Sequence, residues 1–105
     1  MSRFVKVAKA SVLAENGKLA VEAEGRSIAL FKVDERVFAV DNYCPHAGYV
    51  LDDGELDGKT VVCALHGATF DLADGRCVGG PRCSDIQAYA TRVTKGGDIE
   101  LEMDS

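Results

Sequence analysis

The sequence predicts an all-β fold, and three features of its 105 residues carry that prediction. Short apolar runs alternate with polar residues, so that side chains would point alternately to the two faces of a sheet. Glycine, asparagine and aspartate separate these runs at close intervals, as expected for tight turns. No window repeats its apolar residues with the 3.6-residue period of an amphipathic helix. We therefore expect antiparallel sheets joined by short turns.

The first part of the chain predicts an antiparallel meander. Its alternating stretches are loose at the start and cleaner from Lys18 onward, where Leu19, Val21 and Ala23 share one face. The expected strands are residues 4–9, 18–24, 27–33 and 36–40. The expected turns are Asn16-Gly17, Gly25-Arg26 and Asp34-Glu35.

The second part predicts a short-stranded insert followed by a closing hairpin. The expected strands are residues 60–64, 69–72, 88–94 and 99–103, with a very short element between the turns at Asp53-Gly54 and Asp57-Gly58. Gly79-Gly80-Pro81 is expected to be a loop. With no repeat, linker or low-complexity tract, residues 1–105 are expected to form a single domain. Base sheets from residues 1–41 and 84–105 would flank a subdomain of residues 42–83.

Two half-motifs dominate the insert: Cys44-x-His46 and Cys63-x-x-His66. The chain has only two histidines, and each lies within three residues of a cysteine, so chance placement is a poor explanation. Two thiolates and two imidazoles can bind one zinc ion or a [2Fe-2S] cluster. Structural zinc sites usually pair cysteine with cysteine and histidine with histidine in sequence, whereas each half-motif here supplies one sulfur and one nitrogen. This mixed order favours a dinuclear centre, with a mononuclear zinc site as the alternative.

The two half-motifs, read as Cys44-Pro45-His46 and Cys63-Ala64-Leu65-His66, resemble the motif of Rieske [2Fe-2S] proteins. The resemblance extends over nearly the whole chain and implies the Rieske fold. It also implies that Cys44 and Cys63 bind an inner iron, and that His46 and His66 bind an outer, more exposed iron. The chain departs from the pattern at Ala64, where the family usually has proline, but it lacks no ligand.

Other positions of the resemblance imply a low reduction potential. High-potential members have a disulfide at the positions of Tyr49 and Leu65, and hydroxyl donors at the positions of Ala68 and Phe70. Without those donors the reduced cluster is stabilised less, so we expect a potential of about −150 mV, the low end of the Rieske range. The resemblance further implies that the loop at Pro81 covers the cluster.

Cys77 and Cys83 remain outside this ligand set. They lie on either side of the Gly79-Gly80-Pro81 loop and could form a disulfide after a bend in the chain. We expect instead two independent thiols, because a cytoplasmic compartment disfavours a stable disulfide.

Composition limits the partners. The formal net charge is −5, which argues against nucleic acid or an anionic membrane as a partner and suits a basic patch on a redox partner. The first residues contain no apolar run long enough for a signal peptide or membrane anchor, so we expect a cytoplasmic protein. With three Tyr, four Phe and no Trp, the core is thin, and a bound cluster would contribute to folding.

The resemblance is to ferredoxins of bacterial ring-hydroxylating dioxygenase systems. It implies a monomeric electron carrier, not an enzyme, that takes one electron from a flavoprotein NAD(P)H reductase and passes it to a terminal oxygenase in aromatic catabolism. An oxygenase would need a further iron held by two more histidines, which the chain does not have. The small subunit of an assimilatory nitrite reductase and a structural zinc module are the alternatives.

Overall fold

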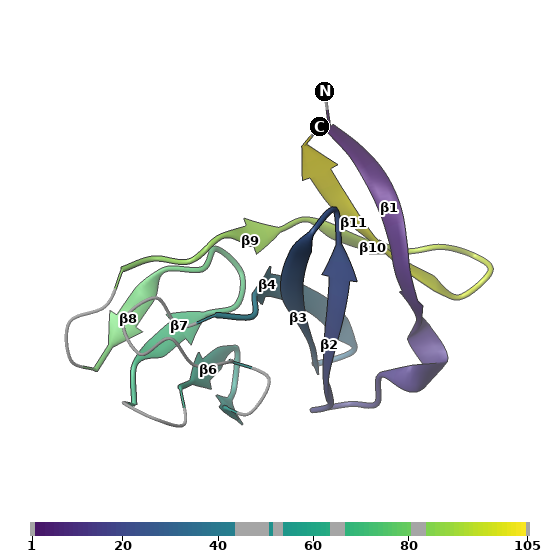
Figure 1. Ribbon diagram of the computed structural model, residues 1–105. Coiled ribbons are helices and arrows are strands. Elements are labelled where there is room, and N and C mark those ends of the chain that lie inside the picture. The colour runs from purple at the N-terminus through teal and green to yellow at the C-terminus, as the bar shows by residue number, and fades with distance from the viewer. Residues whose placement is uncertain (1, 44–50, 52–53, 64–66, 81–83, 105) are drawn as a thin grey trace.

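The described part of the chain forms three antiparallel sheets, which confirms the all-β prediction (Figure 1). The computed structural model describes residues 2–43, 51, 54–63, 67–80 and 84–104. The elements in chain order are β1 (Ser2–Lys9), the 3-10 turn η1 (Ala10–Val12), β2 (Lys18–Ala23), β3 (Arg26–Val33), β4 (Arg36–Asp41), β5 (Glu55–Asp57), β6 (Thr60–Val62), β7 (Thr69–Asp71), β8 (Cys77–Gly79), β9 (Ala88–Tyr89), β10 (Thr91–Val93) and β11 (Asp98–Asp104).

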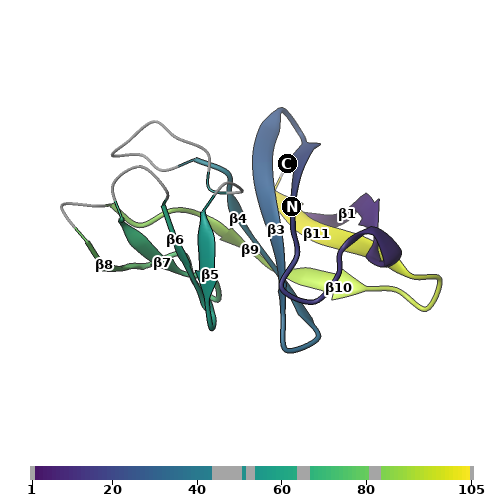
Figure 2. The same cartoon turned by 90° about the horizontal axis from the view of Figure 1, so that it is seen from below.

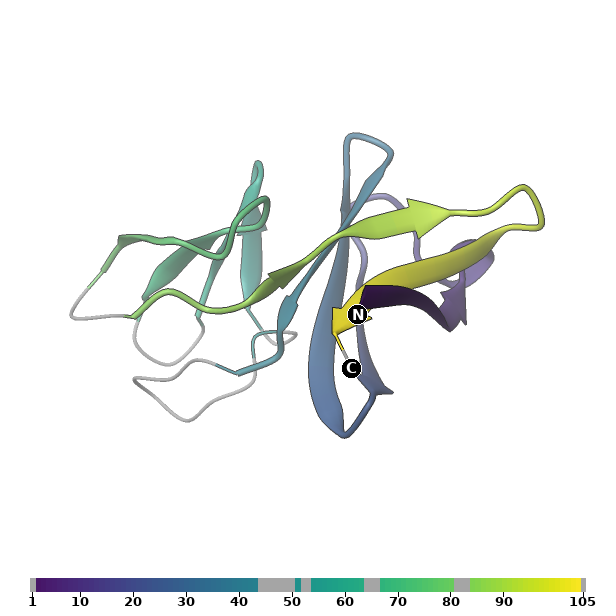
Figure 3. The same cartoon turned by 90° about the horizontal axis from the view of Figure 1, so that it is seen from above.

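The three sheets lie side by side in space. The terminal sheet has the order β1-β11-β10, the central sheet β2-β3-β4-β9 and the inserted sheet β5-β6-β7-β8. Figures 2 and 3 show the central sheet between the other two, with the inserted sheet on one side and the terminal sheet on the other. We call the terminal and central sheets together the base.

Strand β3 supplies side chains to two separate cores. Ile28 and Leu30 pack in the core shared with the terminal sheet, whereas Ala29, Phe31 and Val33 pack in the core shared with the inserted sheet. Neighbouring residues of a strand point to opposite faces, so a strand covered on both sides reads as a continuous apolar run. All five side chains are buried. β3 therefore connects the packing of the base to that of the insert.

The expected meander holds for β2, β3 and β4 but not for β1. β1 pairs along its length with β11, from Ser2 opposite Asp104 to Lys9 opposite Asp98, and β2 pairs only with β3. The expectation that the first strand belongs to the meander is therefore wrong. The chain instead crosses from the terminal to the central sheet through η1 and the following residues, where Leu13 is buried between the two sheets. The 3-10 turn η1 has only three residues, so it is too short to produce a helical period in the sequence.

Two further differences from the expectation lie near the insert. The stretch expected as one strand over residues 88–94 is broken at Ala90, because β9 pairs with β4 while β10 pairs with β11. The chain thus changes sheets at this point. Gly79, expected to begin the loop at Gly79-Gly80-Pro81, is instead the last residue of β8 at the edge of the inserted sheet. The short element between two turns is confirmed as β5.

The turn between β3 and β4 has an unusual sequence for its backbone conformation. Asp34 and Glu35 both have positive φ, 53° and 64°, which non-glycine residues adopt at a cost of about 1–2 kcal/mol each. The carboxylate of Glu15 accepts hydrogen bonds from the backbone N–H groups of both residues, at 2.7 and 2.9 Å. These charge-assisted hydrogen bonds offset part of that cost.

Candidate metal centre

Of the four predicted ligands, the structure describes Cys63. Cys44, His46 and His66 lie outside the described residues, as do the motif positions Tyr49, Ala64 and Leu65. The residues that flank both half-motifs are described, and they show how each ligand loop is anchored. We call residues 44–50 the first ligand loop and residues 63–68 the second.

The second ligand loop begins where β6 ends and closes where β7 begins. Val62 lies opposite Thr69 in the β6–β7 ladder, and the Cys63 N–H donates to the Ala68 carbonyl at 2.7 Å. The Gly67 N–H donates to the Cys63 carbonyl at 2.9 Å, and Gly67 has a φ of +74°, which favours glycine. Both ends of this loop are thus held by the hairpin that carries it.

The Cys63 side chain lies in an apolar environment with no disulfide partner. It is 1% exposed and packs in the core that contains Leu51, Val61, Ala68 and Phe70. A thiolate that binds iron must be free of a disulfide, and an apolar shell around it excludes solvent. Cys63 therefore fits the inner-iron role that the motif resemblance implies.

None of the described side chains that pack with Cys63 in this core offers a hydroxyl donor. Ala68 and Phe70 are both fully buried and apolar. The hydroxyl of Thr69, which lies between them in the sequence, donates to the Gly67 carbonyl at 3.3 Å. Because hydrogen bonds to the sulfurs raise the potential, the low potential expected from the sequence stays a prediction for measurement.

A close backbone contact holds the end of β8 against the second ligand loop. Gly80 has a φ of +92°, and a Cβ atom at this position would lie 2.7 Å from the Cα of Ala68 and from the carbonyl oxygen of Gly67. Only glycine fits such an approach. Pro81 lies outside the described residues, so its expected role as a cover remains a prediction.

Cys77 is not the independent thiol that we expected. It is disulfide-bonded in the structure, through a partner outside the described residues, and its N–H donates to the Asp85 carboxylate at 2.9 Å. The expectation was wrong because it rested on the redox compartment rather than on geometry. Cys83 lies outside the described residues. Because its sulfur is in a disulfide, Cys77 is not available as a metal ligand.

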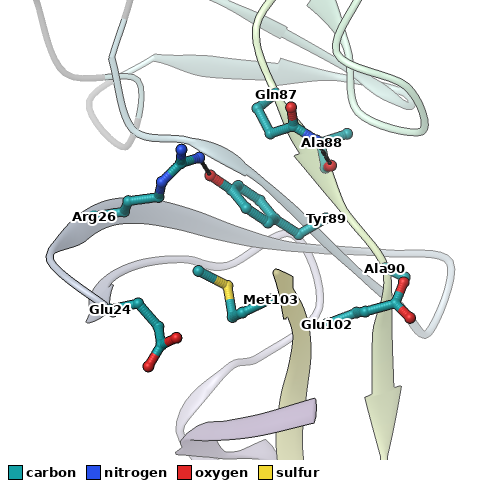
Figure 4. A pocket seen from close by; sticks show the side chains of 8 residues that line it. All are labelled: Glu24, Arg26, Gln87, Ala88, Tyr89, Ala90, Glu102 and Met103. Atoms are coloured by element: carbon teal, nitrogen blue, oxygen red, sulfur yellow. Dashed lines mark hydrogen bonds between the residues drawn. The ribbon is translucent and has the colours of Figure 1, made fainter. Parts of the chain in front are cut away.

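The first ligand loop leaves the central sheet through a polar network that sequence reasoning missed. Asn42 is buried, and its N–H donates to the Ser27 carbonyl at 3.0 Å. The Tyr89 hydroxyl donates to Asp41 at 2.5 Å and accepts a hydrogen bond from Arg26 at 2.8 Å. Figure 4 shows the Arg26 side chain reaching the Tyr89 hydroxyl beside a hollow of about 270 Å³. No sequence signal links residues that lie 48 and 63 positions apart.

The same network changes the acidity of Tyr89. Burial raises the pKa of Tyr89 above its usual value of 10.0, and the hydrogen bond to Asp41 raises it further. Arg26 acts in the opposite direction but is outweighed. The hydroxyl therefore stays protonated, and it can donate to Asp41 throughout the neutral range.

The described residues contain neither a metal-binding cluster nor a membrane-spanning helix. Within them, no three His, Cys, Asp or Glu side chains are grouped to hold a metal ion, which follows from three of the four predicted ligands lying elsewhere in the chain. No helix in the described part of the chain is long and apolar enough to span a membrane.

Comparison with known proteins finds relatives that match most of this chain. The ferredoxin component of the naphthalene 1,2-dioxygenase system of Pseudomonas putida is 30% identical over 91 residues, covering 87% of this chain and 88% of that protein. The ferredoxin of carbazole 1,9a-dioxygenase from Nocardioides aromaticivorans IC177 is 27% identical and has a TM-score of 0.87, over 93% of this chain and 95% of that one. A structure described as an NADH-dependent nitrite reductase small subunit from Mycobacterium tuberculosis is 26% identical with a TM-score of 0.89, over 100% and 98% of the two chains.

The family model described as the Rieske [2Fe-2S] domain matches residues 3–90, which include both half-motifs and run from β1 to β9, leaving out β10 and β11 of the terminal sheet. The cofactor of this family is a Rieske-type [2Fe-2S] cluster, and the free, buried thiol of Cys63 is compatible with it. On this match and on its homology to dioxygenase ferredoxins, the chain belongs to the Rieske [2Fe-2S] domain family.

Proposed function

We propose that this protein is a one-electron carrier that passes electrons from a flavoprotein NAD(P)H reductase to a terminal oxygenase. The observation that carries the proposal is the similarity to dioxygenase ferredoxins over most of the length of both chains. A Rieske cluster supplies reversible one-electron chemistry when it is bound. The protein itself makes and breaks no substrate bond in this role.

We propose Cys44, His46, Cys63 and His66 as the four ligands. Cys63 and the buried apolar side chains around it would hold the inner end of the cluster away from solvent. His46 and His66 would present the outer end to a partner. Residues 42–83 would form the cluster-binding subdomain, with the inserted sheet as its frame.

The ligand set is tested by replacing each of the four residues with alanine. Each variant should lose iron and acid-labile sulfide, and the reduced protein should lose the EPR signal of mixed nitrogen and sulfur ligation. The matched control is the double variant Cys77→Ser/Cys83→Ser, because it removes both cysteines outside the proposed set together. Full iron content in a ligand variant would contradict the assignment.

The carrier role is tested by kinetics and by voltammetry. A flavin reductase supplied with NADH should reduce the protein rapidly, and the reduced protein should support turnover by a ring-hydroxylating oxygenase. Because Ala68 and Phe70 provide no hydroxyl donor, the potential should be about −150 mV. A value above about +100 mV, in the upper part of the Rieske range, would contradict this prediction.

A second candidate is the small subunit of a nitrite reductase. It is favoured by the similarity in fold and length to the Mycobacterium tuberculosis structure. Comigration with a large sirohaem-containing subunit would support it, whereas a separately purified monomer reduced by a flavin reductase supports the carrier. A structural zinc module would be colourless and contain one zinc ion, so elemental analysis separates it from both.

A further inference from the structure

We propose that Lys18 and Tyr89 are positioning residues that hold the two ends of the first ligand loop against the central sheet. The inference rests on the proposed ligands Cys44 and His46, which lie within that loop. Residues 41–43 before the loop and residues 51 and 54 after it are described, and on each side one of these residues is held by a side chain from the base. These two contacts come from opposite edges of the central sheet, β2 and β9.

The upstream contact is the network around Tyr89. Asp41 is the last residue of β4, three positions before Cys44, and its carboxylate accepts the hydrogen bond of the Tyr89 hydroxyl at 2.5 Å. The Asp41 N–H also donates to the Gln87 carbonyl at 2.9 Å, which extends the β4–β9 pairing to the point where the chain leaves the sheet. Arg26 donates to the same hydroxyl and so fixes its orientation. The entrance to the loop is thereby fixed by side chains of β3, β4 and β9.

The downstream contact is made by Lys18. Its ammonium group donates to the Gly54 carbonyl at 2.6 Å, between residues 36 positions apart. The Gly54 N–H donates to the Leu51 carbonyl at 2.8 Å, so Lys18 holds the turn that begins directly after the loop. A Cβ atom at Gly54 would lie 2.3 Å from the Val62 carbonyl, which shows how closely this turn packs on β6.

The second ligand loop is held differently. Its ends are joined to each other by the Cys63–Ala68 hydrogen bond, and its neighbour Gly80 directly follows β8 of the inserted sheet. Within the described part of the chain, the Lys18 and Tyr89 side chains donate to Gly54 and Asp41 and not to this loop. Loss of a base contact should therefore loosen the first loop and leave the second loop in place.

The experiment compares Lys18→Met and Tyr89→Phe with the control Thr91→Val in the cluster-loaded protein. Each of the first two substitutions keeps most of the side chain: Lys18→Met removes one hydrogen-bond donor, and Tyr89→Phe removes the donor to Asp41 together with the acceptor of the Arg26 hydrogen bond. Thr91→Val also removes a donor to a carbonyl, that of Val37 at 2.7 Å, but this bond lies within the base. Cluster release is followed as loss of visible absorbance in excess chelator, alongside the EPR spectrum of the reduced protein and the thermal unfolding midpoint.

We expect Lys18→Met and Tyr89→Phe to release iron about three- to tenfold faster than the wild type, the factor expected for one net hydrogen bond. Their EPR g-values should shift, and Lys18→Arg should restore the release rate. Thr91→Val should lower the unfolding midpoint but leave the release rate and the g-values unchanged. A purely structural role would move the midpoint alone.

Two outcomes would overturn the proposal, and they are distinguishable. If the wild type shows the EPR signature of mixed ligation but both variants release iron at the rate of Thr91→Val, the positioning role is wrong and the ligand set stands. If the wild type lacks that signature, the proposed ligands are wrong and the positioning role falls with them.

Discussion

The base and the inserted sheet are both antiparallel, but they are stabilised in different ways. The base contains strands of six to eight residues, such as β1, β2, β3 and β11, whereas each strand of the inserted sheet has three residues. Strands this short bury little apolar surface of their own. The inserted sheet compensates by packing on β3 and by close backbone approaches at glycine.

The glycines make this difference concrete. In the inserted region, a Cβ atom at Gly75 would lie 2.0 Å from the Ile86 carbonyl oxygen, and Gly54 and Gly80 are similarly enclosed. In the base, Gly25 and Gly97 also have positive φ but have no atom within 4 Å of an added Cβ. At Gly25 and Gly97 glycine therefore serves backbone conformation alone, whereas at Gly54, Gly75 and Gly80 it allows two chain segments to touch.

The largest expected loss of stability comes from truncating a buried side chain on one face of β3 at a time. Phe31→Ala and Leu30→Ala remove fully buried side chains from the two separate cores and should cost about 3–5 and 2–5 kcal/mol of unfolding free energy, respectively. Hydrogen exchange should become faster mainly in β6 and β7 for the first variant and mainly in β11 for the second. Equal acceleration of both regions by both variants would show that the two cores are not separable.

The next largest loss of stability is expected at glycine, and it tests whether glycine is needed for close packing or for backbone conformation alone. Gly75→Ala should destabilise the protein by about 3 kcal/mol or more, because the new methyl group meets the Ile86 backbone and the φ of +78° is unfavourable. Gly25→Ala, at a φ of +79° in open space, should cost only about 1 kcal/mol. Urea unfolding of the two variants measures the difference. Similar losses would mean that backbone conformation alone explains both positions.

A smaller loss of stability is expected in the base, at the turn between β3 and β4. Glu15→Ala removes the acceptor of the Asp34 and Glu35 N–H groups and should cost about 1 kcal/mol. The control is Glu22→Ala, which removes an exposed carboxylate of β2. Chemical denaturation at fixed salt measures both, and an equal change in the two variants would argue against a specific role for Glu15.

The smallest effect is a pH dependence at the junction of the two regions. The folded protein holds the Tyr89 proton more tightly than the unfolded chain, so this group's contribution is complete below pH 10 and is lost as the pH rises through the folded-state pKa. The stability difference between the wild type and Tyr89→Phe should therefore shrink from about pH 10 upward. Urea titrations from about pH 8 to pH 11 measure it. A difference that does not change with pH would contradict the raised pKa.

The sequence predicted local structure well and long-range structure poorly. Alternation and turn residues identified β2, β3 and β4 almost to the residue, because these depend on neighbours in the chain. The pairing of β1 with β11 and the sheet change at Ala90 depend on contacts across the whole chain, which alternation does not encode.

For the site, the ligand spacing carried its own chemical signature, so the cofactor could be predicted from two short motifs. The side chains that we propose as positioning residues carried no such signature in the sequence. Lys18 and Tyr89 are ordinary strand residues in the sequence, and they become important only because β2 and β9 form the two edges of the central sheet.

The pairing of Ser2 with Asp104 places the two ends of the described chain together in the terminal sheet (Figure 1). The central sheet lies between them and the inserted sheet. An affinity tag, a fluorescent fusion or a tether to an electrode joined at either end would therefore lie on the side of the central sheet that is away from the inserted sheet.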